Sequence, residues 1–379
     1  MTIPRRTLTL RSNLRHRQWL GAASFALASF ALVSFTLAAC ATEPGGDGAG
    51  GPSGPEVMRS TVDNTIVPDV AAFNVAAQGM QGEVDAFCAA PSPEALDGLQ
   101  ASWRSLSEAW NTVAAYNLGP LDDDFITPKI IFFESMRQRG IDYTQTVRDT
   151  AAMAIGGADP LDDAFFDGLT FNRVGMLALE VLVFEDSREG GSTDPADIVA
   201  DYEEQARKCE YLRGIMAQIV GRAAQLDTEW NDSFAGGEAF RDTMLGTELP
   251  DGAEPVAGLL IAVQDHLLYI KERKLEGILD AQLSGHFYPN VAAMLDGLEN
   301  LLVQPAPDDA VGMLDFMAAR GLDDDVALVE ANLAMAQTAA ANEDRDALIT
   351  AIGLLEGNVK REIPDGLGVE LGITFSDGD

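Results

Sequence analysis

Apolar residues recur every three or four positions through most of this chain, and this spacing constrains the fold more than any other feature of the sequence. It is clear in the segment 69–88, which follows a break at Pro68, and longest in the segment 195–226. Side chains at this spacing share one face of an α-helix, whereas a half-buried strand would alternate apolar and polar residues. We therefore expect an all-α protein whose helices bury their apolar faces against one another.

The chain of 379 residues divides into parts of different composition. An N-terminal leader (1–39) and a stretch rich in glycine and proline (40–56) precede the helical patterns, and the sequence WNDSFAGGE interrupts them at residues 230–238. Clusters of glycine and polar residues typically mark loops. We predict a signal peptide, a flexible tether and two tandem helical bundles, at residues 57–230 and 231–379.

The leader combines positive charge with a long apolar run. It holds five arginines and no acidic residue, and residues 19–39 are largely apolar. This composition is typical of a secretion signal, although a run of about 20 apolar residues is also long enough to span a membrane. The run ends in LAAC at residues 37–40, which resembles the signal of bacterial lipoproteins. We therefore predict cleavage before Cys40 and lipidation of its thiol.

These features predict that the mature protein lies in the bacterial cell envelope. The lipid on Cys40 would anchor it to a membrane. The next residue, Ala41, is not the aspartate that favours retention in the inner membrane. We expect attachment to the outer membrane, with the body facing the periplasm and held away from the lipid by the tether.

The predicted mature chain is strongly acidic. The sequence has 25 basic and 60 acidic residues, and removal of the five leader arginines leaves a net charge of about −40. Such a body repels nucleic acids and anionic lipid surfaces, so we expect no nucleic-acid partner and assign the membrane contact to the lipid alone. A solvated surface that favours solubility explains the acidity better than a field dedicated to collecting cations.

Two cysteines remain in the predicted mature chain after Cys40. Cys88 and Cys209 each lie on the apolar face of a predicted helix. An even pair of cysteines in an exported protein most simply forms a disulfide, and we predict one here. Two buried free thiols are the alternative.

One acidic residue, Glu180, lies in the otherwise apolar run VGMLALEVLVF at residues 174–184. In a helix its neighbours three and four positions away are all apolar, so we expect the carboxylate to be buried. A buried carboxylate must be protonated, hydrogen-bonded, paired with a basic residue or bound to a cation. An internal ion pair or hydrogen bond and a ligand or metal site therefore both stay open.

Few other residues of the predicted mature chain suit catalysis or metal binding. Its histidines are His266 and His286, and it contains no H-E-x-x-H, paired C-x-x-C, G-x-S-x-G or glycine-rich phosphate loop. Two imidazoles and scattered carboxylates are a poor set of zinc ligands. A lone histidine on an apolar helix is more often structural than a ligand, and we keep His266 as a candidate.

The run GMLALEVLVF at residues 175–184 resembles the signature helix of the imelysin family, whose signature is usually written G-x-H-x-x-E. Gly175 and Glu180 match this signature, and Leu177 stands where it has histidine. Four other stretches agree with the family: AYNLGP at 115–120, KCEYLRGIMAQI at 208–219, ERKLEGI at 272–278 and LGVELGITFSDGD at 367–379. The resemblance spans the predicted mature chain.

The resemblance implies an all-helical envelope protein of two bundle domains, with a site near the signature helix at the domain interface. The family is linked to iron uptake, and its founding member was described as an insulin-cleaving membrane protease. We therefore expect a non-catalytic binding or accessory component of iron or metal acquisition. Iron or another divalent cation is the candidate cofactor, and a metal or an envelope transport protein is the candidate partner. Gly175, Glu180 and His266 are the candidate ligand-binding residues, and Glu180 is the candidate metal ligand.

Two alternative functions stay open. A metallopeptidase of the imelysin type would need a metal centre, and Leu177 removes the imidazole that a metal site or a hydrolytic mechanism would use. A structural or partner-docking lipoprotein would need no ligand at Glu180.

Overall fold

The structure is a computed structural model that describes residues 51–122, 129–188, 191–304, 307 and 310–371. The signal peptide, Cys40 and most of the tether lie outside these residues, so their assignments stay predictions. Within them all regular structure is helical, which confirms the predicted all-α fold. None of the helices in this part of the chain is both long and apolar enough to cross a membrane.

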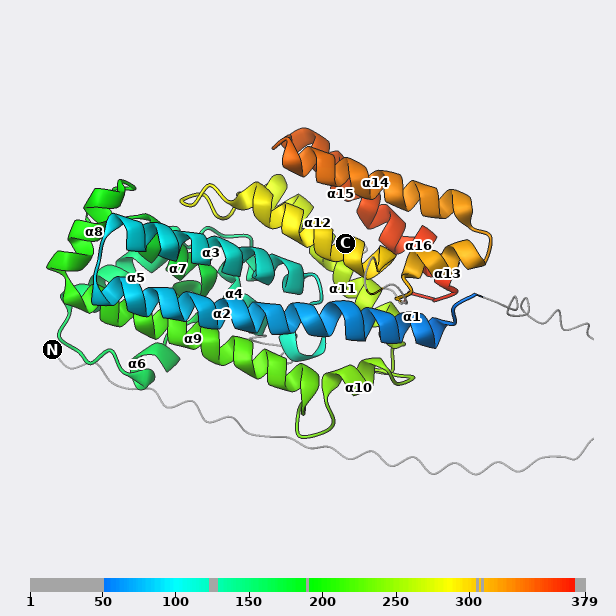
Figure 1. Ribbon diagram of the computed structural model, residues 1–379, viewed down its shortest axis with the longest axis horizontal. Coiled ribbons are helices and arrows are strands. Elements are labelled where there is room, and N and C mark those ends of the chain that lie inside the picture. The colour runs from blue at the N-terminus through cyan, green and yellow to red at the C-terminus, as the bar shows by residue number, and fades with distance from the viewer. Residues whose placement is uncertain (1–50, 123–128, 189–190, 305–306, 308–309, 372–379) are drawn as a thin grey trace, which may run out of the picture. The chain divides into compact units, whose positions relative to one another are not determined.

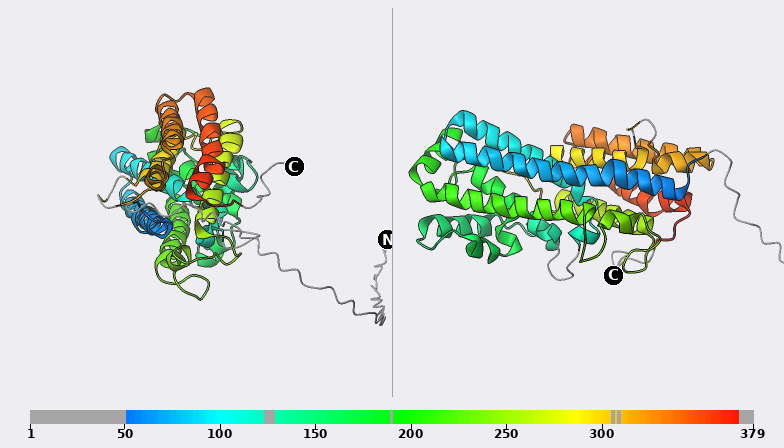
Figure 2. Two further views of the ribbon diagram at one scale, coloured as in Figure 1. Left: turned by 90° about the vertical axis from the view of Figure 1, so that its right-hand side faces the viewer. Right: turned by 60° about the horizontal axis from the view of Figure 1, so that its bottom comes forward.

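The first group of helices is built around a hairpin of two long helices. Its α-helices are α1 (Gly54–Thr61), α2 (Val67–Ala89), α3 (Pro93–Ala114), α4 (Lys129–Phe133), α5 (Thr144–Gly156), α6 (Asp163–Asp167), α7 (Gly175–Phe184), α8 (Pro195–Glu204) and α9 (Ala206–Asn231). The α2–α3 hairpin packs along α9, and α2 and α9 run side by side in both Figure 1 and Figure 2. The short α7 lies where α3, α5 and α9 meet.

The second group of helices packs onto the first through α3. Its α-helices are α10 (Phe240–Met244), α11 (Pro255–Tyr269), α12 (Phe287–Val303), α13 (Met313–Ala319), α14 (Asp323–Ala341), α15 (Arg345–Lys360) and α16 (Glu362–Leu367). The helix α12 lies between α3 and α14, and α15 packs on both α14 and α11. In Figures 1 and 2, α14 and α15 lie together on the side away from α9. The division into two domains near residue 230 stays a prediction.

Shorter helical turns connect these elements. Two are π-helical, Val62–Ile66 and Ile270–Leu275, and they extend α1 and α11 without a break. Three are 3₁₀ turns, at Gly119–Leu121, Ser135–Gln138 and Phe171–Arg173. Single π-helical turns within α-helices often occur at functional sites. The turn at Ile270–Leu275 carries Lys274, which borders the candidate site.

Local sequence explains where α3 begins and which face it buries. The Oγ of Ser92 accepts a hydrogen bond from the backbone N–H of Ala95 at 3.1 Å, and Pro93 occupies the first turn, where its missing N–H has no cost. Trp103 and Trp110, seven positions apart on one face of α3, are both fully buried. These two indole rings bring aromatic surface to the interior beside α7.

A disulfide links the two long helices of the first group. Cys88, at the end of α2, is bonded to Cys209, near the start of α9, as the sequence predicts. The bond joins residues that are 121 positions apart in the chain. It therefore fixes the α2–α9 pair at the end where the α2–α3 hairpin turns.

Candidate functional site

The start of α7 depends on a glycine. Gly175 has a φ of +84°, a left-handed conformation that side chains disfavour. A Cβ at this position would lie 2.4 Å from the carbonyl oxygen of Phe132 and 2.6 Å from that of Phe133. Only glycine lets α7 pack this closely on the backbone of α4. The structure thus gives Gly175 a positioning role, and its role in ligand binding stays a prediction.

Glu180 is buried on α7 and hydrogen-bonded to a distant loop. Its side chain is 3% exposed. Its Oε1 accepts two hydrogen bonds from Ser284, from the backbone N–H at 2.9 Å and from the hydroxyl at 2.8 Å. Among the described residues no basic side chain forms an ion pair with this carboxylate. The hydrogen bonds from the loop at Ser284 therefore offset part of the cost of burying this carboxylate.

This environment changes the acidity of Glu180. Burial raises the pKa of its carboxyl to about 7, against a usual value of 4.5. The hydrogen bonds from Ser284 oppose this rise, and the charge of the nearby Asp280 adds to it. Hydrogen bonds to the charged form and burial act in opposite directions, and here burial dominates. Glu180 therefore changes charge close to neutral pH.

Glu180 lies on the wall of a cavity of about 330 Å³. The wall draws residues from α3, α7, the loop after the Ile270–Leu275 turn and the first turn of α12. Much of it is apolar, through Trp103, Trp110, Met176, Leu177, Leu279 and Leu283. Leu177, the residue in place of the signature histidine, thus contributes hydrocarbon surface to the cavity. Concave sites with apolar walls and a few polar groups are typical of ligand binding.

A buried ionic network borders the same cavity. The Nζ of Lys274 lies 2.7 Å from Glu134 Oε1 and 2.7 Å from Asp280 Oδ2, and the lysine side chain is 1% exposed. The hydroxyl of Tyr269 donates to Glu134 at 2.6 Å. The π-helical turn Ile270–Leu275 places Lys274 between the two acids. A buried charge of this kind needs its partners, since removal of one leaves the others uncompensated.

The two acids of the network titrate differently. Burial raises the pKa of Glu134, but the charge of Lys274 and the hydrogen bonds it receives outweigh burial, so its pKa lies below the usual value. Burial raises the pKa of Asp280 above its usual value, and the charge of Glu134 adds to this rise. Glu134 therefore holds its negative charge more firmly than Asp280. Both acids line the cavity.

Asn290, on the first turn of α12, also lines the cavity. Its side chain is 2% exposed, and neither Oδ1 nor Nδ2 has a hydrogen-bond partner. Most buried polar side chains in proteins are hydrogen-bonded, so an unpaired amide is unusual. No sequence pattern singles out Asn290, Glu134 or Lys274 as residues of the site. Lys274 does lie in ERKLEGI, one of the stretches that carry the family resemblance, and this was the one available signal.

The two histidines of the described residues lie apart from the cavity wall. His266 is fully buried, and the guanidinium of Arg137 donates to its Nδ1 at 2.8 Å. Burial lowers the pKa of His266 well below its usual value, so the ring is neutral. His286 lies 2.7 Å from Glu108, through its Nε2. Within the part of the chain described, no three histidine, cysteine, aspartate or glutamate side chains form a group suited to a metal ion.

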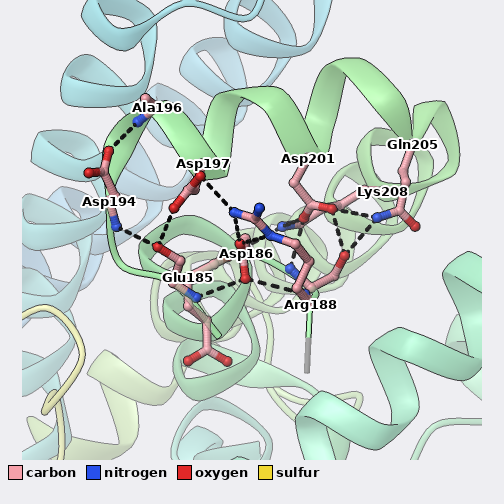
Figure 3. Close-up of polar contacts among 11 residues, drawn as sticks. Glu185, Asp186, Arg188, Asp194, Ala196, Asp197, Asp201, Gln205 and Lys208 are labelled. Atoms are coloured by element: carbon pink, nitrogen blue, oxygen red, sulfur yellow. Dashed lines mark hydrogen bonds and ion pairs between the residues drawn. The ribbon is translucent and has the colours of Figure 1, made fainter. Parts of the chain in front are cut away.

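A second polar cluster lies at the loop between α7 and α8 (Figure 3). Lys208 is buried and lies 2.5 Å from Asp201, which also accepts hydrogen bonds from the backbone N–H and hydroxyl of Ser187. Arg188 pairs with Asp186 and with Asp197. These acids each have a basic partner. The cluster therefore holds the loop against α9, and its acids Asp186, Asp197 and Asp201, unlike Glu180, are each paired with a basic side chain.

Comparison with known proteins places this geometry in context. A family model named Peptidase_M75 and described as Imelysin matches residues 66–356. The fold is similar to that of an imelysin-like protein from Psychrobacter arcticum, with a TM-score of 0.64 and 14% identity over 85% of this chain and 99% of that one. It is also similar to a protein from Parabacteroides distasonis described as a candidate iron-regulated protein A precursor, with a TM-score of 0.56 and 13% identity over 85% of this chain and 97% of that one. No protein of curated function matches the sequence significantly.

Replacing Gly175 by alanine tests the close contact at the start of α7. Gly175→Ala should lower the free energy of unfolding by about 2 kcal/mol or more, because the new Cβ would meet two carbonyl oxygens at a positive φ. Gly79→Ala is the matched control. Gly79 lies within α2 with no atom near an added Cβ, so this change should stabilise the protein by about 0.5 to 1 kcal/mol. Urea unfolding measures both, and an equal effect of the two substitutions would contradict the proposed role.

The raised pKa of Glu180 predicts a pH-dependent stability. The folded chain keeps the carboxyl proton up to about pH 7, whereas the unfolded chain releases it near pH 4.5. The stability from the neutral carboxyl is present below that lower value and is lost as the pH rises through about 7. Relative to Glu180→Gln, the wild type should therefore lose up to about 3 kcal/mol between pH 4.5 and pH 8. Urea unfolding of both proteins across this range measures the loss, and a pH-independent difference would show that Glu180 ionises as freely as in an unfolded chain.

Proposed function

Because the chain belongs to the imelysin family, we propose that it is a lipid-anchored, non-catalytic binding component of the bacterial cell envelope that works in the acquisition of iron or another metal. The cavity beside Glu180 is the proposed binding site. The ligand would present positive charge to this carboxylate. The fold relative described as a candidate iron-regulated protein supports the metal role, since regulation by iron is what that description states of it.

The observation that carries this proposal is a buried acid without a basic partner. Glu134, Asp186 and Asp201 are all buried acids, and each is paired with a lysine or an arginine. Glu180 has hydrogen bonds from Ser284 and from the backbone of Leu283 but no basic partner among the described residues, although it lines a cavity with room for a ligand. A cation in that cavity would supply the missing charge and stabilise the ionised carboxylate.

Leu177 supports a binding role over a peptidase role. It lines the cavity three residues before Glu180, at the position where the family signature has histidine. Leucine can neither coordinate a metal nor transfer a proton, so the cavity wall gains hydrocarbon where a catalytic site would need an imidazole. The two remaining histidines of the predicted mature chain do not line the cavity.

Cation binding at Glu180 can be measured directly. Isothermal titration calorimetry of the mature lipoprotein in detergent, with Fe²⁺ under anaerobic conditions and with Mn²⁺ and Zn²⁺, should show one bound cation. Because the cation binds the ionised carboxylate, affinity should rise about tenfold from pH 6 to pH 8. Glu180→Gln should weaken binding about tenfold or more, since the loss of one charged contact costs about 1.5 kcal/mol or more.

The control for this titration is Glu203→Gln. Glu203 is an exposed acid on α8, so its substitution changes the net charge equally without touching the cavity. It should leave the affinity unchanged. Equal losses in the two variants would reduce the effect to general charge, and binding of none of the three ions would refute the metal role. Metal-dependent cleavage of a peptide library would favour the peptidase instead.

The lipid anchor has its own test. Expressed in a bacterium that processes lipoproteins, the chain should yield a mature polypeptide that begins at Cys40, carries added lipid mass and partitions into detergent. Cys40→Ser should block the lipidation and the partitioning. Joint replacement of Cys88 and Cys209 by serine is the control, because these residues form a disulfide within the body of the protein. A processed but lipid-free wild-type chain would refute the anchor.

A further inference from the structure

The cavity beside Glu180 is larger than a bare cation requires. Its volume of about 330 Å³ would hold roughly ten water molecules, at about 30 Å³ each. It lies at the lower end of the range for small-molecule sites, about 300 to 1,000 Å³. Trp103, Trp110 and Leu177 give it an apolar wall, which a hydrated ion does not complement. The size and the wall both favour an organic ligand.

Asn290 shows which polar group such a ligand carries. The side-chain amide offers one acceptor, Oδ1, and one donor group, Nδ2, and both are buried without a partner. Leaving a buried donor and a buried acceptor unpaired is unfavourable. A primary carboxamide presents the complementary donor and acceptor on one edge, so a single group of this type can satisfy both atoms. A trans peptide group has its N–H and C=O on opposite sides, but one residue of an extended peptide presents its own N–H and C=O on the same edge. A bare cation would satisfy only Oδ1.

Glu180 indicates that the same ligand carries a second polar group; the two polar groups are called its poles below. Its carboxylate lines the same cavity as Asn290 and lacks a basic partner. An ammonium group donates hydrogen bonds and carries the compensating charge. Arg148, the basic residue on the wall, is held by two hydrogen bonds to Glu185 at 2.5 and 2.7 Å, so it is already engaged.

We propose that this cavity binds an amino-amide, a small organic cation whose ammonium group pairs with Glu180, whose amide edge pairs with Asn290, and whose apolar part packs on the tryptophan and leucine wall. The inference rests on the proposed function, since it takes the Glu180 cavity as the binding site, and it specifies the ligand that enters there. Two sources offer an ammonium group together with such an edge: a free amino-acid amide, through its carboxamide, and the N-terminal end of an extended peptide, through the N–H and C=O of its second residue.

Three matched probes test the two poles separately. Leucinamide carries both groups, 3-methylbutylamine carries the ammonium alone, and 4-methylpentanamide carries the amide alone. Calorimetry at pH 7.5 should show leucinamide binding about tenfold more tightly than either single-pole probe, because each pole adds a buried hydrogen-bonded contact. The amidated tripeptide Leu-Gly-Gly distinguishes the sources: binding equal to leucinamide indicates a peptide end, and much weaker binding indicates a free amino-amide.

Variants assign each pole to its residue. Asn290→Leu, which is similar in size, should reduce leucinamide binding to the level of the amine probe and leave the amine probe unchanged. Glu180→Gln should reduce leucinamide binding to the level of the amide probe. Glu203→Gln and Asn342→Leu, at exposed positions away from the cavity, should change neither. Asn290→Ser, which removes the amide but keeps a small polar group, provides a second test if the leucine variant does not fold.

Two results would overturn the amino-amide proposal. One is leucinamide that binds no more tightly than both single-pole probes, and the other is wild-type affinity in the folded Asn290 variants. The metal role is decided separately. If metal ions bind through Glu180 while leucinamide does not bind, only the amino-amide proposal fails. If leucinamide binds through Glu180 and Asn290 while none of the metal ions binds, the metal role fails and the amino-amide proposal stands.

Discussion

The candidate site depends on one buried ammonium group, that of Lys274. It lies between Glu134, which precedes α7 in the chain, and Asp280, in the loop that follows α11. Without it, two buried acids would face each other across the cavity wall, and at least one would have to take up a proton. The π-helical turn Ile270–Leu275 is what brings the lysine to this position. The interior can therefore hold acidic residues around a cavity without collapsing or unfolding.

Against this background, Glu134 and Glu180 show how position decides the chemistry of a side chain. Both are buried glutamates on one cavity. Glu134 has a lysine and a tyrosine as partners and a lowered pKa, whereas Glu180 has hydrogen bonds from one loop, no basic partner, and a pKa of about 7. Environments that push the pKa values of like groups apart are typical of functional sites. Glu180 is the acid whose charge a ligand can control.

The sequence predicts the parts of this arrangement that local spacing determines. Helical periodicity indicates the all-α fold, two cysteines in an exported chain indicate the disulfide, and the apolar neighbours of Glu180 indicate its burial. The remaining features depend on contacts between distant segments. Ser284 lies 104 residues beyond Glu180, and nothing near Asn290 in the sequence reveals an unpaired amide. For Gly175, the close approach to α4 that requires a glycine exists only in the folded chain.

The disulfide between Cys88 and Cys209 affects the two sides of the cavity differently. The covalent ring that it closes contains α3 and α7, and with them the tryptophans, Leu177 and Glu180. Ser284 and Asn290 lie outside this ring. The wall formed by α3 and α7 thus belongs to a segment that the disulfide closes into a ring. The facing wall, with Ser284 and Asn290, belongs to a segment without such a cross-link. The cross-link therefore lowers the entropy of the unfolded segment that carries Glu180, whereas the segment that carries Ser284 keeps its full chain freedom when unfolded.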